Sequence, residues 1–215
     1  MHDKVLNITN GDYFNEYLKS KLGEESVPFC EAMMDGETTS DIFSDEFVAT
    51  RSRALNVTED EYRSKMHVPR ALSGREHGGL CLWFGKDTFC QVNLLTLLTY
   101  LEQIGYPGEV RLNYIDDESF EVLESGIEVE LGGYGKIYED IFASKCVPRD
   151  VGVLCERAIE LYFDYKSEDG ALARLVNANA DKSRVELVHL LLKESKEYGL
   201  SDAQAEGLID SALPR

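Results

Sequence analysis

Residues 79–106 read GLCLWFGKDTFCQVNLLTLLTYLEQIGY, and this stretch predicts a buried strand, a tight loop and a long helix. The run 80–84 is apolar without a break, which is typical of a strand covered on both faces in a parallel sheet. Asp87 is placed to cap the helix that follows, in which apolar residues recur at helical spacing. Gly105 is placed to end that helix.

A strand at 110–115, VRLNYI, follows the helix and completes a β-loop-α-β unit. In parallel sheets, ligands bind outside the carboxyl ends of the strands, beside the loop that joins strand to helix. Gly85, Lys86, Asp87 and Gln91 are therefore expected at a ligand site. Gln91 lies four residues after Asp87, which places both side chains on one face of the helix. The alternative is that this polar pair makes only capping contacts with the neighbouring backbone.

The chain opens with a second unit of the same kind. Residues 4–9, KVLNIT, predict a strand, Asn10-Gly11-Asp12 a polar turn, and residues 13–22 a helix with one apolar face. Glycine lets a ligand approach the backbone closely, and the aspartate is placed to cap the helix. The turn is interpreted either as a cap alone or as part of a site beside the first loop. Neither GxGxxG nor GxxxxGK[ST] occurs, so no dinucleotide fingerprint or P-loop is predicted.

The segment between these two units predicts one strand and several helices. The strand is expected at 26–32, with Pro28 placing it at a sheet edge or at its own first residues. Within the excursion 33–78, a helix is predicted at 42–55, and residues 58–61 have the pattern of a capping box. This excursion is expected to form a lid or side wall over the strand ends.

The chain beyond residue 118 has a mainly helical pattern. Residues 127–131 alternate apolar and charged, which indicates an exposed antiparallel or edge strand. Helices are predicted at 134–145, 151–166, 170–177, 183–198 and 203–213. The sequence therefore predicts an α/β fold of Rossmann-like type. Residues 1–118 would hold a mostly parallel sheet flanked by helices, and residues 119–215 a mainly helical C-terminal domain.

Composition limits the class of partner. The 215 residues carry a net charge of −18 with acidic residues spread along the whole chain, so direct binding of nucleic acid is not expected. Apolar runs are far shorter than the roughly 20 residues that span a bilayer, and the N-terminus lacks the pattern of a signal peptide. Five scattered cysteines without a CxxC pair indicate reduced thiols in a cytoplasm. The four histidines do not cluster, so no structural zinc site is expected.

Three segments resemble an uncharacterised bacterial family that carries a domain of unknown function. They are LNITNGDYFNEYL at 6–18, the helix with Arg51, and LCLWFGKDTFCQVNLLTLLTYL at 80–101. Members of that family begin with a strand ending in Gly-Asp and later carry a strand-Trp-x-x-x-Asp-x-x-x-Gln-helix segment. The matching positions here are Gly11, Asp12, Trp83, Asp87 and Gln91. The resemblance covers most of 4–116 and extends to 195–209; it implies a fold and a site location but no reaction.

A carboxylate follows each predicted parallel strand. These residues are Asp12, Glu31, Asp87 and Asp116. Because the carboxyl ends of parallel strands share one edge, the four groups are expected along that edge, where they would raise one another's pKa for acid-base work or bind Mg²⁺. Asp12 or Asp87 would be the acid-base group and Gln91 would orient the ligand. The other candidates for ligand binding are Asn10, Gly11, Arg51, Trp83, Gly85 and Lys86.

Alternative interpretations remain open for several of these residues. Trp83 would either stack on a planar ligand or belong to the core, and Arg51 would either meet an anionic ligand or be solvated. Cys81 and Cys90 flank the Gly85 loop, but no histidine lies near them in sequence, so buried apolar cysteines are expected rather than a nucleophile.

Two classes of function agree with this sequence. The first is a small-ligand site for a nucleotide-like or other phosphorylated compound, with hydrolase or transferase chemistry. The second is a non-catalytic interaction or regulatory protein whose acidic surface and helical C-terminal half dock a basic protein partner. The first class expects Asp87→Asn and Gln91→Ala to abolish ligand binding without unfolding the protein.

Overall fold

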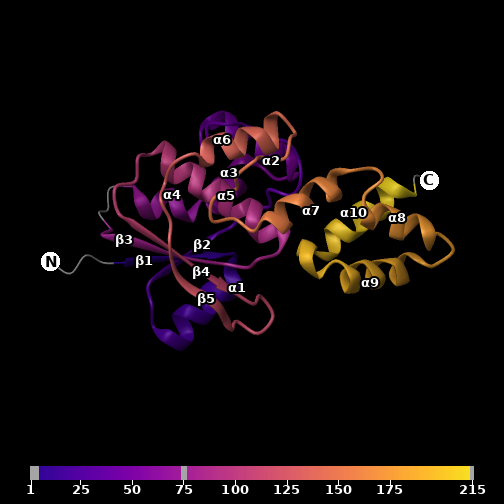
Figure 1. Cartoon of the computed structure of the whole chain (residues 1–215), viewed down its shortest axis with the longest axis horizontal. Helices are drawn as coiled ribbons and strands as arrows, with labels where there is room; N and C mark the ends of the chain where they lie inside the picture. The colour runs from indigo at the N-terminus through magenta and orange to yellow at the C-terminus, as the bar shows by residue number, and fades with distance from the viewer. Residues whose placement is uncertain (1–4, 74–76, 214–215) are drawn as a thin grey trace.

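The computed structural model describes residues 5–73 and 77–213, and these residues form one mixed sheet surrounded by helices (Figure 1). The strands, in sheet order, are β2 (Ser26–Phe29), β1 (Val5–Asn10), β3 (Gly79–Phe84), β4 (Glu109–Ile115) and β5 (Val122–Glu128). β1 to β4 pair in parallel, whereas β5 pairs antiparallel with β4 at the edge. The predicted α/β fold with a mostly parallel sheet is confirmed. Lys4, predicted to begin the first strand, lies outside the described residues.

Helices connect the strands and cover the sheet. Before β3 they are α1 (Asp12–Tyr17), the π-helical turn η1 (Leu18–Leu22), α2 (Asp45–Ala54), α3 (Glu59–Ser64) and α4 (His67–Leu72). After β3 they are α5 (Thr88–Gln103), α6 (Tyr134–Tyr138), the π-helical turn η2 (Glu139–Ala143), α7 (Glu156–Lys166), α8 (Ala171–Ala178), α9 (Arg184–Glu194), the 3-10 turn η3 (Lys196–Tyr198) and α10 (Asp202–Ala212). In the described part of the chain, no helix combines the length and the apolar character needed to cross a membrane.

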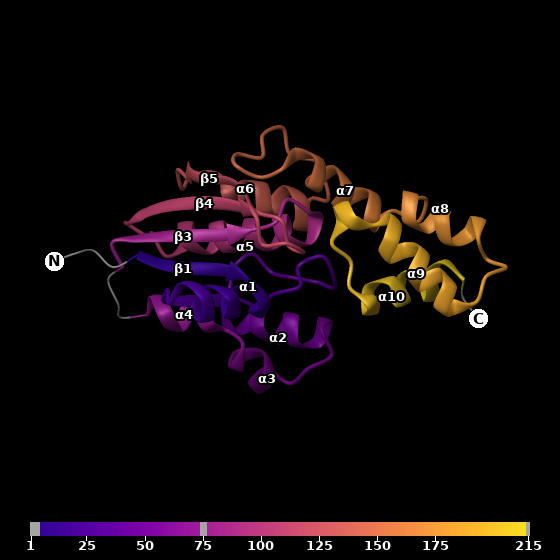
Figure 2. The ribbon, with the colours of Figure 1, turned by 90° about the horizontal axis from the view of Figure 1, so that it is seen from below.

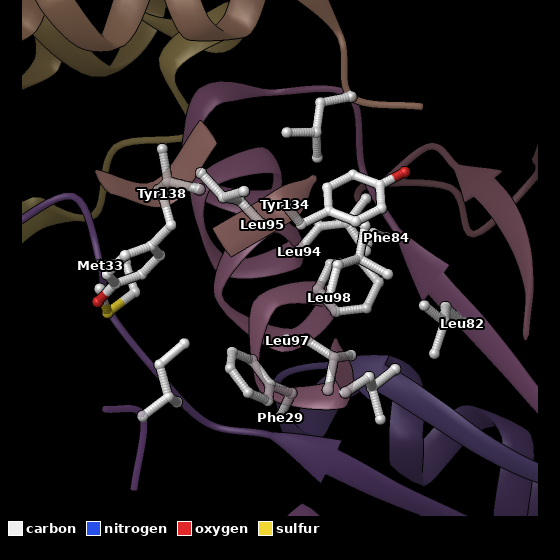
Figure 3. Packing of buried hydrophobic residues seen from close by; sticks show 14 of the residues in the cluster. Phe29, Met33, Leu82, Phe84, Leu94, Leu95, Leu97, Leu98, Tyr134 and Tyr138 are labelled. Carbon is white, nitrogen blue, oxygen red and sulfur yellow. The ribbon is translucent and has the colours of Figure 1, made fainter. Parts of the chain in front are cut away.

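The main core lies between one face of the sheet and α5. Strand residues alternate between the two faces, and Leu82 and Phe84 belong to the set that points toward this core. Figure 3 shows these side chains gathered with Leu94 and Leu98 of α5, all of them fully buried. Buried residues, apolar and polar, cover nearly the whole circumference of α5 because the sheet lies on one side of it and later helices on the other.

The opposite face of the sheet is covered less completely. Figure 1 shows α1 on the other side of the sheet from α5 and α6. Cys81 and Trp83 point to this side and are only half-buried. The prediction that the run 80–84 is covered on both faces is therefore wrong for these two positions, because α1 has only six residues and packs over one end of the strands.

The order of the strands creates a crevice between β1 and β3. The chain leaves β1 through α1 on one face of the sheet, whereas it leaves β3 through α5 on the opposite face. Helices that depart from neighbouring strands toward opposite faces leave an opening at the carboxyl ends of those strands, where α/β proteins bind their ligands. In this chain the opening lies between the turn after β1 and the Gly85 loop after β3.

The C-terminal helices stand beyond the carboxyl ends of the strands, as Figure 2 shows for α7 to α10. They enclose a second core, which includes Leu161, Val176 and Leu191. The main core continues past residue 118 as far as Tyr162, and β5 belongs to the main sheet. The division at 118 stays a prediction about domains, but in the described residues the change from one core to the other falls within α7.

Local signals placed several element ends correctly and misplaced others. Asp87 caps α5, and the capping box of Thr58 and Glu61 is formed as predicted. The prediction that Asp12 caps the first helix is wrong: Gly11, with a φ of 79°, holds the N-cap position and Asp12 is the first helical residue.

Two of the predicted long C-terminal helices are shorter than their apolar patterns suggested. The helix predicted at 151–166 begins only at Glu156. The segment before it is not helical, because Val151 and Leu154 are buried in the main core. The helix predicted at 183–198 ends at Glu194 and continues as the 3-10 turn η3. The edge strand expected at 127–131 pairs antiparallel as predicted but occupies residues 122–128.

Candidate functional site at the carboxyl edge of the sheet

A cavity of about 750 Å³ lies at the carboxyl ends of β1, β3 and β4, below α7 and η3. Its wall includes Asn10 at the end of β1, Asp87 after β3 and Asp117 after β4. On the opposite side, α7 contributes Arg157 and η3 contributes Lys196. The volume is that of a pocket for a small molecule, and the cavity lies at the edge of the sheet where α/β proteins bind ligands; that it is a ligand site stays a prediction.

Asp87 has two roles, one for each carboxylate oxygen. Its Oδ1 accepts a hydrogen bond of 3.0 Å from the Cys90 backbone N–H, which satisfies a free donor in the first turn of α5. Its Oδ2 is buried and has no hydrogen-bond partner among the described residues. A buried, unpartnered carboxylate oxygen is unfavourable, so this atom is available for a proton or a cation.

Gly85 and Gly199 have no side chain, and this leaves the space that the Asp87 carboxylate occupies. A Cβ atom on Gly85 would collide with the carboxylates of Asp87 and Asp117, and one on Gly199 would collide with Asp87. Gly199 also has a φ of 67°, which L-residues rarely adopt. It follows η3, so the C-terminal region lies directly against the carboxylate that caps α5.

Asp117 and Cys90 complete a cluster around Asp87, with one ligand atom from each residue within 4.8 Å of the others. Part of Asp117 is exposed, but its Oδ2 accepts a hydrogen bond of 3.4 Å from the Cys90 thiol. Burial of the carboxyl group, together with the neighbouring Asp87 carboxylate, raises the pKa of Asp117 to about 8, whereas the hydrogen bond from the Cys90 thiol lowers it. At neutral pH the Asp117 carboxyl group is therefore mostly protonated.

Cys90 stays a neutral thiol in this cluster. Burial and the charges of Asp87 and Asp117 raise the pKa of Cys90 well above its ordinary value. Its sulfur accepts a hydrogen bond of 2.9 Å from the Asn10 side chain, whose oxygen in turn accepts one of 3.0 Å from Asn93. The expectation of a buried apolar cysteine rather than a nucleophile fits this environment.

Cationic side chains around the cavity form ion pairs that are open to solvent. Lys86 lies 3.0 Å from Glu124, and Lys196 lies 3.1 Å from Glu118. Arg157 lies 3.2 Å from the neighbouring Glu160 on α7. Exposed pairs of this kind contribute about 0–1 kcal/mol each, so an incoming anion replaces the carboxylate partner at little cost.

Gln91 is fully buried and holds the loop rather than lining the cavity. Its side-chain N–H donates to the Gly85 carbonyl at 2.5 Å, and its Oε1 accepts from the Cys155 backbone N–H at 2.8 Å. These bonds tie the Gly85 loop to the segment that leads into α7. The geometry supports a positioning role for Gln91, and its predicted direct contact with a ligand stays a prediction.

A second cavity of about 530 Å³ lies beside the first, at the carboxyl ends of β1 and β2. Predicted site residues Gly11, Asp12 and Glu31 line it, and Asn10 and Phe89 line both cavities. The carboxylates expected along one edge are therefore distributed over two compartments, because the Asn10 turn and Phe89 stand between them.

Glu31 and Arg51 form a buried ion pair behind the second cavity. The guanidinium Nη2 lies 2.9 Å from Glu31, and its remaining N–H groups donate to Glu31 again and to the backbone carbonyls of residues 32, 35 and 37. The Tyr62 hydroxyl donates to the other oxygen of Glu31. The donors of Arg51 all have protein acceptors, so this arginine organises the loop after β2. Because it is fully buried, the solvated interpretation is wrong, and its contact with an anionic ligand stays a prediction.

The structure places Trp83 and Asp116 outside the centre of the site. Trp83 lies on the α1 side of the sheet, where its indole N–H donates to Asn7 at 2.9 Å and its ring lies 5.5 Å from that of Phe14. This contact set is that of a packing residue. Asp116 lines the rim of the first cavity, but its carboxylate accepts hydrogen bonds from Ser119, which lower its pKa and form a turn.

Sequence reasoning missed Asp117, Arg157 and Lys196. The signal for Asp117 was present in the acidic end of the strand at 110–115, but only its neighbour Asp116 was singled out. The other two residues come from the helical region, and nothing in their local pattern distinguishes them from solvated charges.

The fold and the two cavities define an α/β protein with a candidate ligand site at the carboxyl edge of its sheet. No protein-family model, curated protein or solved structure matches this chain. The resemblance to a bacterial family of unknown function therefore stays a prediction.

Proposed function

We propose that the first cavity binds a small phosphorylated compound together with a divalent cation, and that the protein acts on this compound as a hydrolase or transferase. One observation carries the proposal. Carboxylate oxygens of Asp87 and Asp117 lie within 4.8 Å of each other in the wall of the cavity, and Oδ2 of Asp87 has no hydrogen-bond partner among the described residues.

The chemistry of the cluster favours a hard cation. Two carboxylates this close repel each other unless a proton or a cation lies between them. Cys90 is held as a thiol by its raised pKa, so it offers hydrogen bonds rather than a thiolate ligand. The available ligand atoms are then carboxylate oxygens, which suit Mg²⁺ when substrate phosphate oxygens and water complete the coordination.

The charge distribution of the wall favours a phosphorylated partner for that cation. A pair of carboxylates alone would repel an anion, whereas a bound divalent cation reverses the sign of the field. Three basic side chains around the cavity are paired only with exposed carboxylates, which a phosphate group can replace. They are Lys86, Arg157 and Lys196. A cation and basic side chains on one phosphate group are the elements that stabilise phosphoryl transfer, in which most catalysis comes from positioning and charge.

The direct test is isothermal titration calorimetry with Mg²⁺ and inorganic triphosphate. Asp117→Asn and Asp87→Asn each remove one ionisable carboxyl group from the pair, and asparagine remains a good N-cap at position 87. Both variants are expected to weaken binding of the Mg²⁺–triphosphate complex about tenfold or more, a cost of about 1.4 kcal/mol.

Asp181→Asn is the matched control, because Asp181 lies in the exposed turn between α8 and α9, away from both cavities. This variant is expected to bind like the unmodified protein. Equal affinity of all three variants and the unmodified protein, or no binding of the complex to the unmodified protein, would overturn the proposal.

A further inference from the structure

We infer that one ligand occupies both cavities, with its phosphate end at the Asp87–Asp117 pair and a planar, largely apolar ring carrying an amino group in the second cavity. This inference rests on the proposed function and narrows the ligand to the nucleotide-like class. It adds a binding compartment whose residues take no part in holding the cation or the phosphate.

The two cavities adjoin at the crevice between β1 and β3. Asn10 and Phe89 line both of them. The Asn10 side chain lies between the two compartments and is held by two hydrogen bonds. Its amide N–H donates to Cys90 and its amide oxygen accepts from Asn93. Phe89 is half-buried and presents part of its ring to the cavities. A ligand that crosses at this point would pass over a fixed polar group and beside an aromatic one.

The lining of the second cavity differs from that of the first. Apolar groups predominate, among them Phe29, Leu55 and Val57. An apolar wall with an aromatic side chain favours a flat ring, which buries both of its faces without leaving charges unpaired.

Asp12 is one of the charged residues that line this compartment, together with Glu31, Glu61 and Lys65. Its carboxylate is exposed and its nearest cation, Lys65, lies 4.0 Å away, which is a weak surface pair. An ionised carboxylate only accepts hydrogen bonds, so it would select a ring that carries N–H donors, such as the exocyclic amine of adenine.

The distance between the compartments sets the length of the ligand. The carboxyl ends of β2 and β4 are three strand spacings apart in the sheet order β2-β1-β3-β4. Neighbouring strands lie about 4.8 Å apart, so the ends are separated by roughly 14 Å. Inorganic phosphate and short polyphosphates reach only the first cavity, whereas an elongated nucleoside polyphosphate reaches both.

The experiment compares Mg²⁺–triphosphate with Mg²⁺–ATP by calorimetry on the full chain. ATP is expected to bind at least about tenfold more tightly than triphosphate, because its ring adds buried apolar area. Val57→Trp places a large side chain in the second cavity from an exposed position. It is expected to remove the advantage of ATP while leaving triphosphate binding unchanged, and Asp12→Asn is expected to reduce that advantage in the same way.

Val185→Trp is the matched control, since Val185 is exposed on α9 and lines neither cavity. Equal affinity for ATP and triphosphate in the unmodified protein would overturn the inference while leaving the proposed function intact. So would an advantage of ATP that survives Val57→Trp. A protein that binds neither complex fails both, and the triphosphate measurement alone tells the two failures apart.

Discussion

Asp87 and Asp117 lie on the loops that follow the neighbouring strands β3 and β4, and the fold brings their carboxylates together over Gly85. They are 30 residues apart in the sequence, yet the parallel pairing of the strands makes their meeting a direct consequence of the sheet order. The cluster gives the first cavity two adjacent acidic side chains. It also gives the protein a pH-dependent stability that is open to measurement.

Asp117→Asn is expected to change how stability depends on pH. The pKa of Asp117 is about 8 in the folded protein, whereas an aspartate in an unfolded chain has a pKa of about 3.9. Between these values the folded state binds more protons than the unfolded state, so this group makes the free energy of unfolding fall as pH rises. The melting temperature of the unmodified protein should therefore drop relative to that of Asp117→Asn between about pH 4 and about pH 8.

Melting curves in the presence of a chelator measure this difference without bound cations. Groups other than the pair titrate in both proteins and cancel in the comparison. A difference in melting temperature that stays constant over this pH range would show that the pKa of Asp117 is not raised in the folded protein.

Gly199→Ala is expected to destabilise the protein more than Gly105→Ala. Both glycines have a positive φ, of 67° and 59°, which costs an L-residue roughly 1 kcal/mol. A Cβ at position 105 would meet open space, whereas a Cβ at position 199 would strike the Asp87 carboxylate. Urea unfolding should show an additional loss of about 1–3 kcal/mol at position 199, the usual cost of overpacking. Equal losses at the two positions would mean that η3 does not press on Asp87.

Arg51→Met is expected to cost about 3–5 kcal/mol of unfolding free energy, because it leaves Glu31 charged and unpaired in the interior. Arg53→Met is the control on the same helix; Arg53 is exposed, so its replacement should change stability by no more than about 0.5 kcal/mol. The double variant Glu31→Gln/Arg51→Met should recover part of the loss, since it removes the unpaired charge. Chemical denaturation of the unmodified protein, the two single variants and the double variant measures these free energies of unfolding. Similar curves for Arg51→Met and Arg53→Met would contradict the buried ion pair.

Gln91→Ala is expected to lower stability by about 1–3 kcal/mol, because the Gly85 carbonyl and the Cys155 N–H lose their buried partner. This differs from the expectation drawn from the sequence, in which the substitution removes ligand binding alone. Denaturant unfolding measures the loss, and calorimetry at low temperature measures binding by the protein that remains folded. A variant with unchanged stability and no binding would restore the direct ligand contact.

The sequence predicted the parts of the fold that are governed by local signals. Asp87 caps α5 and Gly105 follows its end, since a side-chain cap and a positive φ depend on a few neighbouring residues. Pro28 predicted either an edge strand or a place among the first residues of the strand, and β2 lies at the edge of the sheet. By contrast, Val151 and Leu154 continue a helical apolar pattern but lie outside α7, because the main core holds them in a non-helical segment.

The sequence by itself determined the two β-loop-α units and the carboxylates at the strand ends, because strand and helix periodicity is a property of short segments. Only the tertiary structure decided which carboxylates meet. Strand order brought Asp117 to Asp87, the Asn10 turn separated Asp12 from both, and the helical region supplied Arg157 and Lys196. These contacts join segments far apart in the chain, and their free energy depends on how whole elements pack rather than on the residues beside them.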